Sequence, residues 1–446
     1  MSLDNLPVEW FETTLEQIAE WGSGGTPSRK NSSYYGGDVP WIKTGDLGEK
    51  YVTQATEFIT DEAVKNSSAK FFKKGSVIMA MYGATIGKTS ILGVDATTNQ
   101  ACAVGTPIAT STEFLYYFLR NEKNSFIAKG KGGAQPNISQ QIIKAHTIYL
   151  PSLAEQQEIV RQLDSMLAQV EQIKARLDAI PTILKKFRQS VLESYFNNLA
   201  SVQQVNLDDL VVSIDQGWSP KCLNTPASAE QWGVIKTSAI QPLYFDASEN
   251  KELPSNLKPR EALSLISGDV LITRAGPRAR CGVTCIVDKD YDNLMICDKV
   301  YRVRCDSKKI SADYLNLYLN SLTGLSLIEK MKTGSSESGM NLTQSKFKEL
   351  VIPLVSLKQQ LAFAKDIKKF FQLANHIEET VQSAQKRVNL LTQSILAKAF
   401  SGELTTEWRE QHQELITGIN SAESLLAKIQ AEREASKPVK KAKKVK

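Results

Sequence analysis

A long internal repeat constrains the fold of this 446-residue chain more than any other feature of its sequence. Residues 137–156 (NISQQIIKAHTIYLPSLAEQ) align without a gap on residues 341–360 (NLTQSKFKELVIPLVSLKQQ). The same spacing continues downstream, where QSVLESYF at 189–196 falls on QSILAKAF at 393–400. A repeat of this length predicts two copies of one structural plan within the chain.

Upstream the two copies are less alike, although the tripeptide Ile42-Lys43-Thr44 still matches Ile235-Lys236-Thr237 at a slightly shorter spacing. Each copy therefore consists of a variable globular part followed by a more similar arm. The predicted parts are a first globular domain at 1–150, a first arm at 151–200, a second globular domain at 201–355, a second arm at 356–404, and a C-terminal helical segment with a lysine-rich tail at 405–446.

The globular parts carry short apolar and β-branched runs, such as residues 76–81, 270–273 and 300–304, separated by Gly, Pro, Asn and Asp. Helical stretches at 113–119 and 312–319 interrupt them. Because strands and helices do not alternate regularly, the pattern predicts a mixed α/β (α+β) fold with a twisted, mostly antiparallel sheet.

In the arms, apolar residues recur at alternating steps of three and four, which is typical of a coiled-coil seam. Residues 358–400 as one helix would extend about 65 Å, more than the width of a small domain. The simplest way to bury both seams is antiparallel packing of the two arms around a pseudo-two-fold axis. Lys174 and Glu378 are then expected to pair and fix the register, and Pro181 to kink or restart the first arm. The positions that form the two seams are Val160, Leu163, Leu167, Val170 and Leu177, and Leu361, Ala364, Ile367, Phe371, Ala374 and Val381.

The chain contains 54 Lys and Arg and 48 Asp and Glu, which gives a net charge of +6. This excess equals the six lysines that lie between 437 and 446. The rest of the chain is neutral, so a DNA-binding surface requires charges segregated on one face. No run of apolar residues is long enough for a membrane helix, and the N-terminus lacks the pattern of a signal peptide. We therefore expect a cytoplasmic protein without membrane contact.

Known catalytic patterns are missing from the sequence. Six cysteines without a Cys-x-x-Cys pair and three scattered histidines predict neither a metal site nor a nucleophile–histidine triad. The stretch GATIGKT at 83–89 is one residue short of a phosphate-binding loop, and we interpret it as a β-hairpin. The motif with which amino-methyltransferases hold an extruded base is also absent. These patterns favour a binding protein without a catalytic site.

Four motifs resemble the specificity subunit of type I restriction-modification systems: GGTPS at 24–28, VPWIKT at 39–44, LPSLAEQ at 150–156 and LTQSILAKAFSGEL at 391–404. The resemblance spans nearly the whole chain, and residues 405–435 resemble the family branch with an extra C-terminal helical segment. In that family, each globular part is a target-recognition domain that reads one half of a bipartite DNA site, and the arms hold the two domains apart.

The resemblance further implies double-stranded DNA and two methyltransferase subunits as partners, with restriction/translocase subunits recruited through them. S-adenosylmethionine, ATP and Mg²⁺ are expected on those partner subunits, and no cofactor on this chain. Because the two globular parts differ in sequence, the half-sites should differ, with a spacing of about one helical turn, ~34 Å. An orphan recognition subunit without active partners, and a self-contained restriction enzyme, are the alternatives.

Candidate contact residues follow from side-chain chemistry. Arginine forks suit guanine or phosphate, and a glycine-rich loop with lysines at 129–137 suits phosphates. The three arginines between 274 and 280 are the most strongly favoured base readers. The DNA-binding candidates are Arg29, Lys30, Tyr34, Lys43, Tyr82, Lys88, Lys129, Lys131, Gln135, Lys221, Lys236, Arg274, Arg278 and Arg280. On the exposed faces of the arms, the candidates for methyltransferase binding are Glu155, Gln156, Gln189, Gln359, Gln360 and Gln393.

Overall fold

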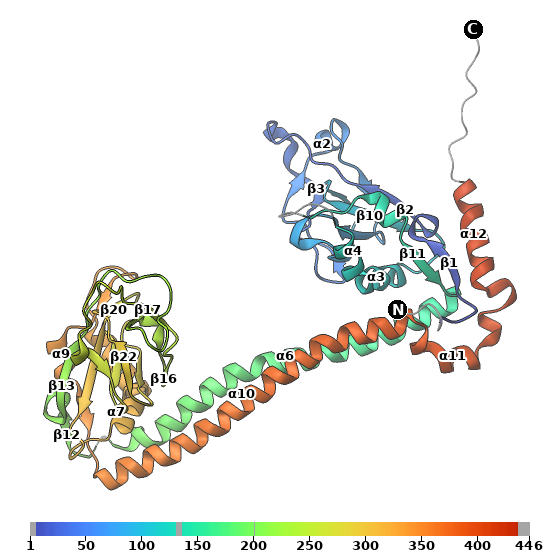
Figure 1. The fold of residues 1–446 in the computed structure, drawn as a ribbon. Helices are drawn as coiled ribbons and strands as arrows, with labels where there is room; N and C mark the ends of the chain where they lie inside the picture. Colours follow the sequence, from blue (N-terminus) through green and yellow to red (C-terminus); the bar gives the residue numbers. More distant parts are fainter. Residues whose placement is uncertain (1–5, 131–135, 200, 436–446) are drawn as a thin grey trace. The chain divides into compact units, whose positions relative to one another are not determined.

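The computed structural model describes residues 6–130, 136–199 and 201–435. It divides into two compact units. Unit 1 combines Met1–Arg176 with Ala384–Lys446, and unit 2 is the continuous stretch Leu177–Ser383. Each unit contains one globular domain, called domain 1 and domain 2 below, and a part of each of the two long helices. Figure 1 shows the elements of both units.

Domain 1 combines a five-stranded sheet, ordered β2-β10-β7-β8-β4, with a four-stranded sheet, ordered β5-β3-β9-β6, and the antiparallel pair β1–β11. Its strands are β1 (Phe11–Thr14), β2 (Ala19–Ser23), β3 (Tyr35–Ile42), β4 (Tyr51–Val52), β5 (Phe58–Ile59), β6 (Phe71–Phe72), β7 (Val77–Ala80), β8 (Thr89–Leu92), β9 (Ala96–Thr98), β10 (Cys102–Pro107) and β11 (Thr147–Leu150). Its helices are α1 (Leu15–Ile18), α2 (Asp61–Lys65), α3 (Thr112–Asn121), α4 (Lys123–Ala128) and α5 (Gln140–Lys144).

Domain 2 repeats this topology. The order β13-β23-β19-β21 corresponds to β2-β10-β7-β8, the order β17-β14-β22-β18 to β5-β3-β9-β6, and the pair β12–β25 to β1–β11. Its strands are β12 (Gln204–Asn206), β13 (Val211–Gln216), β14 (Gly233–Ile235), β15 (Ile240–Gln241), β16 (Tyr244–Phe245), β17 (Asn250–Glu252), β18 (Ser264–Leu265), β19 (Val270–Thr273), β20 (Ala275–Gly276), β21 (Thr284–Ile286), β22 (Tyr291–Met295), β23 (Val300–Cys305), β24 (Met340–Asn341) and β25 (Val351–Pro353). Its helices are α7 (Ala312–Leu319), α8 (Leu322–Met331) and α9 (Gln344–Lys348).

The pairing of strands is mostly antiparallel, as the sequence predicts. The parallel pair β3–β9 of domain 1 recurs in domain 2 as β14–β22. The central strands β7 and β19 are buried at every position, because a helix covers the sheet in each domain: α3 contacts β7 and α7 contacts β19. The mixed α/β class and the internal duplication are therefore confirmed.

Two helices of equal length, α6 (Leu153–Phe196) and α10 (Leu357–Phe400), form the arms. In unit 2 they pack antiparallel, because the ring of Phe187 lies 6.3 Å from that of Phe370 while Tyr195, further along α6, lies 5.0 Å from the earlier residue Phe363. Pro181 lies inside α6, which continues through it as one helix, so the predicted restart is wrong. Glu378 pairs with Arg188 (2.7 Å) instead of the predicted Lys174.

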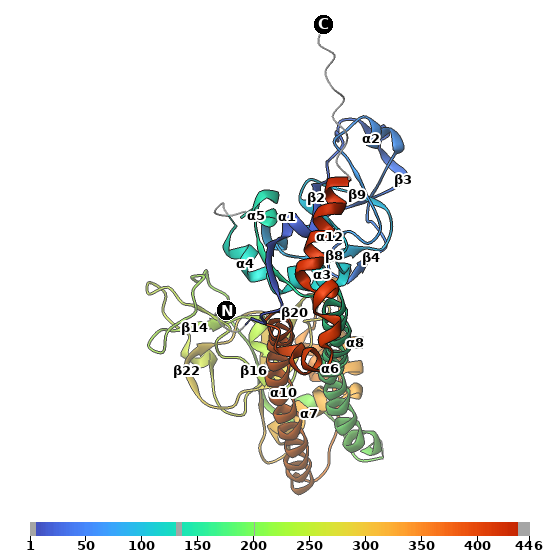
Figure 2. The same cartoon turned by 90° about the vertical axis from the view of Figure 1, so that its right-hand side faces the viewer.

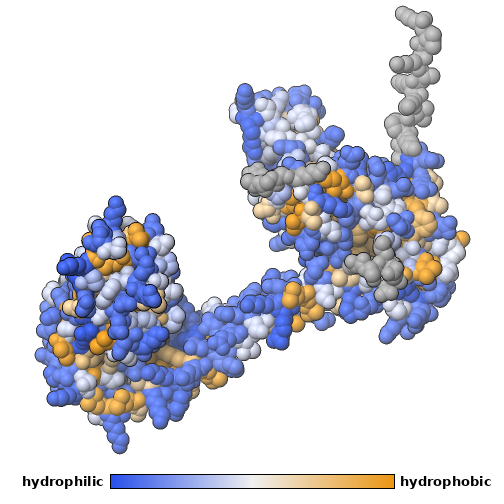
Figure 3. Space-filling model, in the orientation of Figure 1, coloured by the Kyte–Doolittle hydropathy of each residue, from blue (hydrophilic) through white to orange (hydrophobic). Residues whose placement is uncertain are grey.

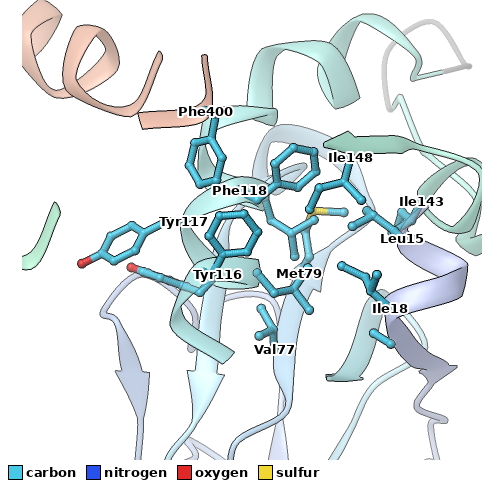
Figure 4. Close-up of a cluster of buried hydrophobic side chains, with 14 of the residues drawn as sticks. Leu15, Ile18, Val77, Met79, Tyr116, Tyr117, Phe118, Ile143, Ile148 and Phe400 are labelled. Carbon is cyan, nitrogen blue, oxygen red and sulfur yellow. The ribbon is translucent and has the colours of Figure 1, made fainter. Parts of the chain in front are cut away.

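An aromatic contact attaches the end of one long helix to each domain. In unit 1, the ring of Phe400 lies 5.4 Å from Phe114 and 5.5 Å from Phe118 on α3. Figure 4 shows Phe400 beside Phe118, in a cluster that also contains Val77 and Met79 of β7. In unit 2, the repeat equivalent Phe196 lies 5.5 Å from both Tyr314 and Tyr318 on α7. The same packing therefore attaches the arms to both domains.

The seam residues agree with the predicted pattern, with one exception. Leu163, Ile367 and Ala374 are fully buried, whereas Leu361 is 58% exposed, so its assignment to the seam is wrong. The GATIGKT stretch connects β7 to β8 through a 3₁₀ turn, Gly83–Thr85, and the two strands pair antiparallel. This confirms the predicted hairpin, since a phosphate-binding loop requires a following helix.

The C-terminal segment, defined as residues 401–435, has no counterpart in the part of the first copy that the structure describes. It contains α11 (Thr406–Gln411) and α12 (Ala422–Ala435) and belongs to unit 1. Helix α12 packs beside α1, and Figures 1 and 2 both show it along domain 1. Leu425 and Ile429 of α12 join the hydrophobic core of this unit. Among the helices that the structure describes, none has the length and apolar character needed to cross a membrane.

Candidate functional site

Two of the predicted DNA-binding residues of domain 1 converge on a carboxylate that the sequence reasoning did not select. Glu57 accepts hydrogen bonds from both terminal nitrogens of Arg29, and the Nη2–Oε2 distance is 2.9 Å. It also accepts one from the Nζ of Lys43, at 3.0 Å. The Arg29 guanidinium also stacks over the rings of Tyr35 (4.3 Å) and Trp41 (5.2 Å). This group of residues is called the Glu57 cluster below.

The electrostatics of the Glu57 cluster keep its carboxylate ionised. The hydrogen bond from Arg29, assisted by Lys43, lowers the pKa of Glu57 from 4.5 to about 2. The same bond raises the pKa of Arg29 above its ordinary value. Two cations and one anion therefore leave one net positive charge at the surface, which suits an acceptor-rich or anionic ligand.

Among the residues that the structure describes, the other candidates of domain 1 form no hydrogen bond or ion pair with Glu57. Lys30, Tyr82 and Lys88 are exposed, and Tyr34 is half-buried in the small core around Val39 and Ile59. Tyr82 forms an isolated β-bridge with Asn137, next to the end of the glycine-rich loop. Lys131 and Gln135 lie outside the described residues. Trp41 belongs to the same small core and is only 2% exposed.

Lys129, at the start of the glycine-rich loop, has its ammonium 2.8 Å from Nδ1 of His146. Nε2 of that buried histidine lies 3.1 Å from Oε2 of Glu122, and its ring packs on Phe126 at 4.5 Å. The hydrogen bond with His146 lowers the pKa of Glu122. Lys129 is itself exposed, so this network fixes the beginning of the loop beside the surface.

In the GGTPS motif, the glycines allow a close approach of two backbones. A Cβ atom on Gly24 would lie 1.9 Å from the carbonyl oxygen of Thr98, and one on Gly25 would lie 2.3 Å from the Ser68 hydroxyl. Any side chain at either position would therefore force these segments apart. The motif serves the packing of the turn that leads to Arg29.

The three arginines of domain 2 that are predicted to read bases all contact groups of their own domain. Arg280 donates to the carbonyl oxygens of Thr237 (2.5 Å) and Ile240 (2.6 Å). Arg274 donates to the carbonyl oxygen of Asp298 (3.0 Å) and to Asn341. Both are half-buried, because a guanidinium with five donors can bind several loop carbonyls of its own domain. These contacts hold Arg274 and Arg280 against their own domain, and base reading by the two residues stays a prediction.

Arg278 is exposed and forms ion pairs with Glu329 (2.5 Å) and Glu337 (3.0 Å). It lines a cleft of about 1050 Å³ within unit 2, together with Tyr244, Leu325, Phe371 and residues of α6 such as Arg188. The other candidates of this domain are Lys221, which is exposed, and Lys236, which pairs with Glu249 at 3.4 Å.

Three of the six residues predicted to bind the methyltransferase are buried in their own units. Glu155, Gln156 and Gln360 are each 0% exposed. Gln156 accepts the backbone N–H of Ser111 (3.0 Å) at the start of α3, and its repeat equivalent Gln360 accepts that of Ser311 (2.8 Å) at the start of α7. The prediction is wrong for these three residues, because they attach the long helices to their own units.

The other three predicted residues remain at least partly at the surface. Gln359 is exposed and accepts hydrogen bonds from Ser356 at the start of α10, and Gln189 donates to Glu193 at 3.1 Å. Gln393 is exposed and its amide lies 3.5 Å from the carbonyl oxygen of Asn121. No contact of these residues excludes a role in binding a partner.

Sequence reasoning missed the two carboxylates that organise the candidate lysines, Glu57 and Glu249. A signal was available, because Lys43 and Lys236 stand at equivalent positions of the Ile-Lys-Thr repeat. Each lysine follows a β-strand, and each is paired with a glutamate downstream. Glu57 follows Lys43 by 14 residues and Glu249 follows Lys236 by 13, so a search for a glutamate at about this distance after each lysine finds both.

Comparison with known proteins identifies the repeated unit. The family model described as the type I restriction modification DNA specificity domain matches residues 7–182 and again residues 219–384. The EcoKI specificity subunit of Escherichia coli K12 is 30% identical over 461 residues, covering 98% of each chain. The EcoBI specificity subunit of Escherichia coli is 32% identical over 347 residues, covering 72% of each chain.

Solved structures agree on the fold. A chain from a type I restriction-modification system described for its complex assembly and conformational transition superimposes with a TM-score of 0.70 at 19% identity, covering 89% of this chain and 98% of that one. The HsdS subunit from Thermoanaerobacter tengcongensis gives a TM-score of 0.56 at 18% identity, with the same coverage. With two matches to the specificity domain and two domains of one topology, this chain belongs to the family of type I restriction-modification specificity subunits.

Proposed function

We propose that this chain is the non-catalytic DNA-recognition subunit of a type I restriction-modification complex in the cytoplasm. Domain 1 reads one half of a bipartite DNA site and domain 2 reads the other half. The observation that carries the proposal is the pair of specificity domains, which share one topology but differ in surface chemistry. The Glu57 cluster has an arginine at position 29, whereas the Lys236–Glu249 pair stands without one. Different donors predict different half-sites and therefore an asymmetric target.

The long helices support docking of partner subunits. In unit 2, α10 exposes Phe370, Leu373 and Ile377, which recur at the spacing of one helix face, and α6 exposes Ile183. Figure 3 shows orange hydrophobic side chains interrupting the hydrophilic surface of the helix pair. Exposed apolar stripes on paired helices are typical of protein interfaces. We infer that they bind methyltransferase subunits, one for each copy of the repeat, through which restriction/translocase subunits join the complex.

The methylation and translocation reactions take place on these partner subunits. S-adenosylmethionine would be held by the methyltransferase subunits for N6 methylation of adenine, and ATP with Mg²⁺ by the translocase subunits. This chain supplies the recognition of double-stranded DNA.

The test is co-expression with the methyltransferase subunit encoded beside this chain in its genome, followed by mapping of N6-methyladenine across a host genome. The expected result is one asymmetric motif of two defined halves separated by a gap of unspecified bases. A stable complex that leaves DNA unmethylated would indicate an orphan recognition subunit. Methylation by this chain expressed alone would contradict its non-catalytic role.

A further inference from the structure

The Glu57 cluster has the geometry of a prearranged hydrogen-bond donor. Glu57 binds the end of the Arg29 fork through two contacts, while Tyr35 and Trp41 fix the plane of the guanidinium by stacking. An arginine held at its end and on one face has little rotational freedom left. The Arg29 side chain nevertheless remains 57% exposed, so the held donor faces solvent.

The donors of this cluster are only partly used within the protein. A guanidinium carries five N–H donors, of which the contact with Glu57 uses two, and the Lys43 ammonium carries three, of which one reaches Glu57. The carboxylate is the sole acceptor among these three charged groups. A ligand that fits this surface therefore presents acceptors, and the Hoogsteen edge of guanine presents two, O6 and N7.

Domain 2 contains a simpler version of the same arrangement. Lys236, the repeat equivalent of Lys43, pairs with Glu249, and the Ser238 hydroxyl donates to the same carboxylate. Cys222 stands at the position that matches Arg29 in the spacing of the Ile-Lys-Thr repeat, so this pair lacks the planar fork. The two copies share the lysine and its carboxylate, and differ in the arginine.

We propose that Glu57 is a positioning residue for base recognition: it orients Arg29 and Lys43 toward a guanine in the half-site read by domain 1. Glu249 performs the corresponding task for Lys236 in the other half-site, with a lysine alone. The proposal rests on the recognition function proposed above and assigns part of its specificity to two acidic residues. Neither carboxylate needs to touch DNA, because each acts through the cation that it holds.

The test uses the full chain in complex with its methyltransferase subunit and reads the methylated motif base by base. Glu57→Gln keeps the size of the side chain but removes the charge that holds both cations. The expected result is loss of preference at one position of one half-site, with methylation at the mismatched sequences rising about tenfold relative to the original site. Arg29→Ala should relax the same position, and Glu249→Gln a position in the opposite half-site.

Glu16→Gln is the matched control, because Glu16 also forms a surface ion pair in unit 1, with Lys144 at 3.6 Å. This variant should leave the motif unchanged. If Glu57→Gln impairs folding, as judged by its thermal unfolding, Arg29→Lys replaces it, since a lysine keeps the charge but cannot bind Glu57 through two nitrogens. Arg29→Lys should relax the same position.

Three results would overturn the inference: an unchanged motif in Glu57→Gln, an equal loss of methylation at all sites, or relaxation of the same half-site by Glu57→Gln and Glu249→Gln. An equal loss would assign Arg29 and Lys43 to phosphate contacts. If the wild-type complex methylates no bipartite site, the recognition function itself fails. A wild-type bipartite motif that the Glu57 variant retains would refute only the positioning role.

Discussion

Glu155 in unit 1 and Gln359 in unit 2 occupy equivalent positions of the repeat, yet their environments are opposite. Glu155 is fully buried and accepts hydrogen bonds from Trp10 (3.0 Å), Thr405 (2.7 Å) and Arg409 (2.6 Å). Gln359 is exposed and binds only to Ser356 at the start of its own helix. This one position of the first helical turn is therefore interior in one copy and at the surface in the other, although the next residue, Gln156 or Gln360, is buried in both.

The difference follows from the C-terminal segment, which is present once. Thr405 and Arg409 belong to this segment and contact Glu155, whereas among the described residues no equivalent segment follows α6 to cover Gln359. Unit 1 also combines both ends of the chain, while unit 2 is one continuous stretch. The Glu155–Arg409 pair thus joins the beginning of the first arm to a segment some 250 residues later. The end of the chain is therefore part of the interior of unit 1, so we expect unit 1, and not unit 2, to depend on it for stability.

The largest difference between the two units is expected for Arg409→Ala. The change leaves the Glu155 carboxylate buried without its cation, which should lower the free energy of unfolding of unit 1 by ~3–5 kcal/mol. Unit 2 should keep its stability. Hydrogen–deuterium exchange followed by mass spectrometry measures this, because it reports protection in each unit separately.

Two control variants sharpen the result. Gln359→Ala removes the equivalent side chain of unit 2 and should change stability by less than about 0.5 kcal/mol, as is usual at the surface. Arg161→Ala removes an exposed ion pair with Glu158 on the first arm and should have a similarly small effect. Equal loss of protection in both units after Arg409→Ala would contradict the assignment of the C-terminal segment to unit 1.

A second pair of variants tests what the two copies share. Gln156→Leu and Gln360→Leu each remove the acceptor for the backbone N–H of a serine, Ser111 or Ser311, at the start of a domain helix. An unsatisfied buried N–H costs ~1–3 kcal/mol, and the two losses should be similar because the contacts are equivalent. Exchange protection of α3 and of α7 measures them. A large loss in one unit alone would show that the two attachments differ.

The sequence predicted the repeated features of the fold well, because each appears twice in the chain. The two domains, the antiparallel arms and the hairpin at 83–89 all follow from local patterns of hydrophobicity and turn residues. The contacts that the sequence could not show depend on segments far apart in the chain. The pairing of Glu378 with Arg188 joins two helices that are far apart in the chain, and α6 continues through Pro181 although proline disfavours a helix interior.

The candidate site was less predictable, for a physical reason. Arg280 and Arg29 look alike in sequence, but Arg280 donates to loop carbonyls while Arg29 is stacked and exposed. Glutamines 156 and 360 looked like helix surface, because a polar residue in the first turn of an arm usually is. Their burial depends on the serine N–H groups that they accept, which come from the preceding domain.

The smallest expected effect concerns the two acidic positioning residues at low pH. The hydrogen bond from Arg29, assisted by Lys43, lowers the pKa of Glu57 from 4.5 to about 2 in the folded protein, so the carboxylate contributes stability above pH 4.5 and loses it as the pH falls toward 2. Near pH 7 the free energy of unfolding of the wild type should exceed that of Glu57→Gln by about 1 kcal/mol, a small value because the ion pair is partly exposed. This difference should vanish near pH 2. Urea unfolding between these pH values measures the difference.

The corresponding variant of domain 2 should show a smaller effect. Hydrogen bonds from Ser238 and Lys236 lower the pKa of Glu249, but this glutamate is more exposed, so Glu249→Gln should change the stability at low pH less. A larger effect of Glu249→Gln would mean that the domain 2 pair is the more tightly held of the two.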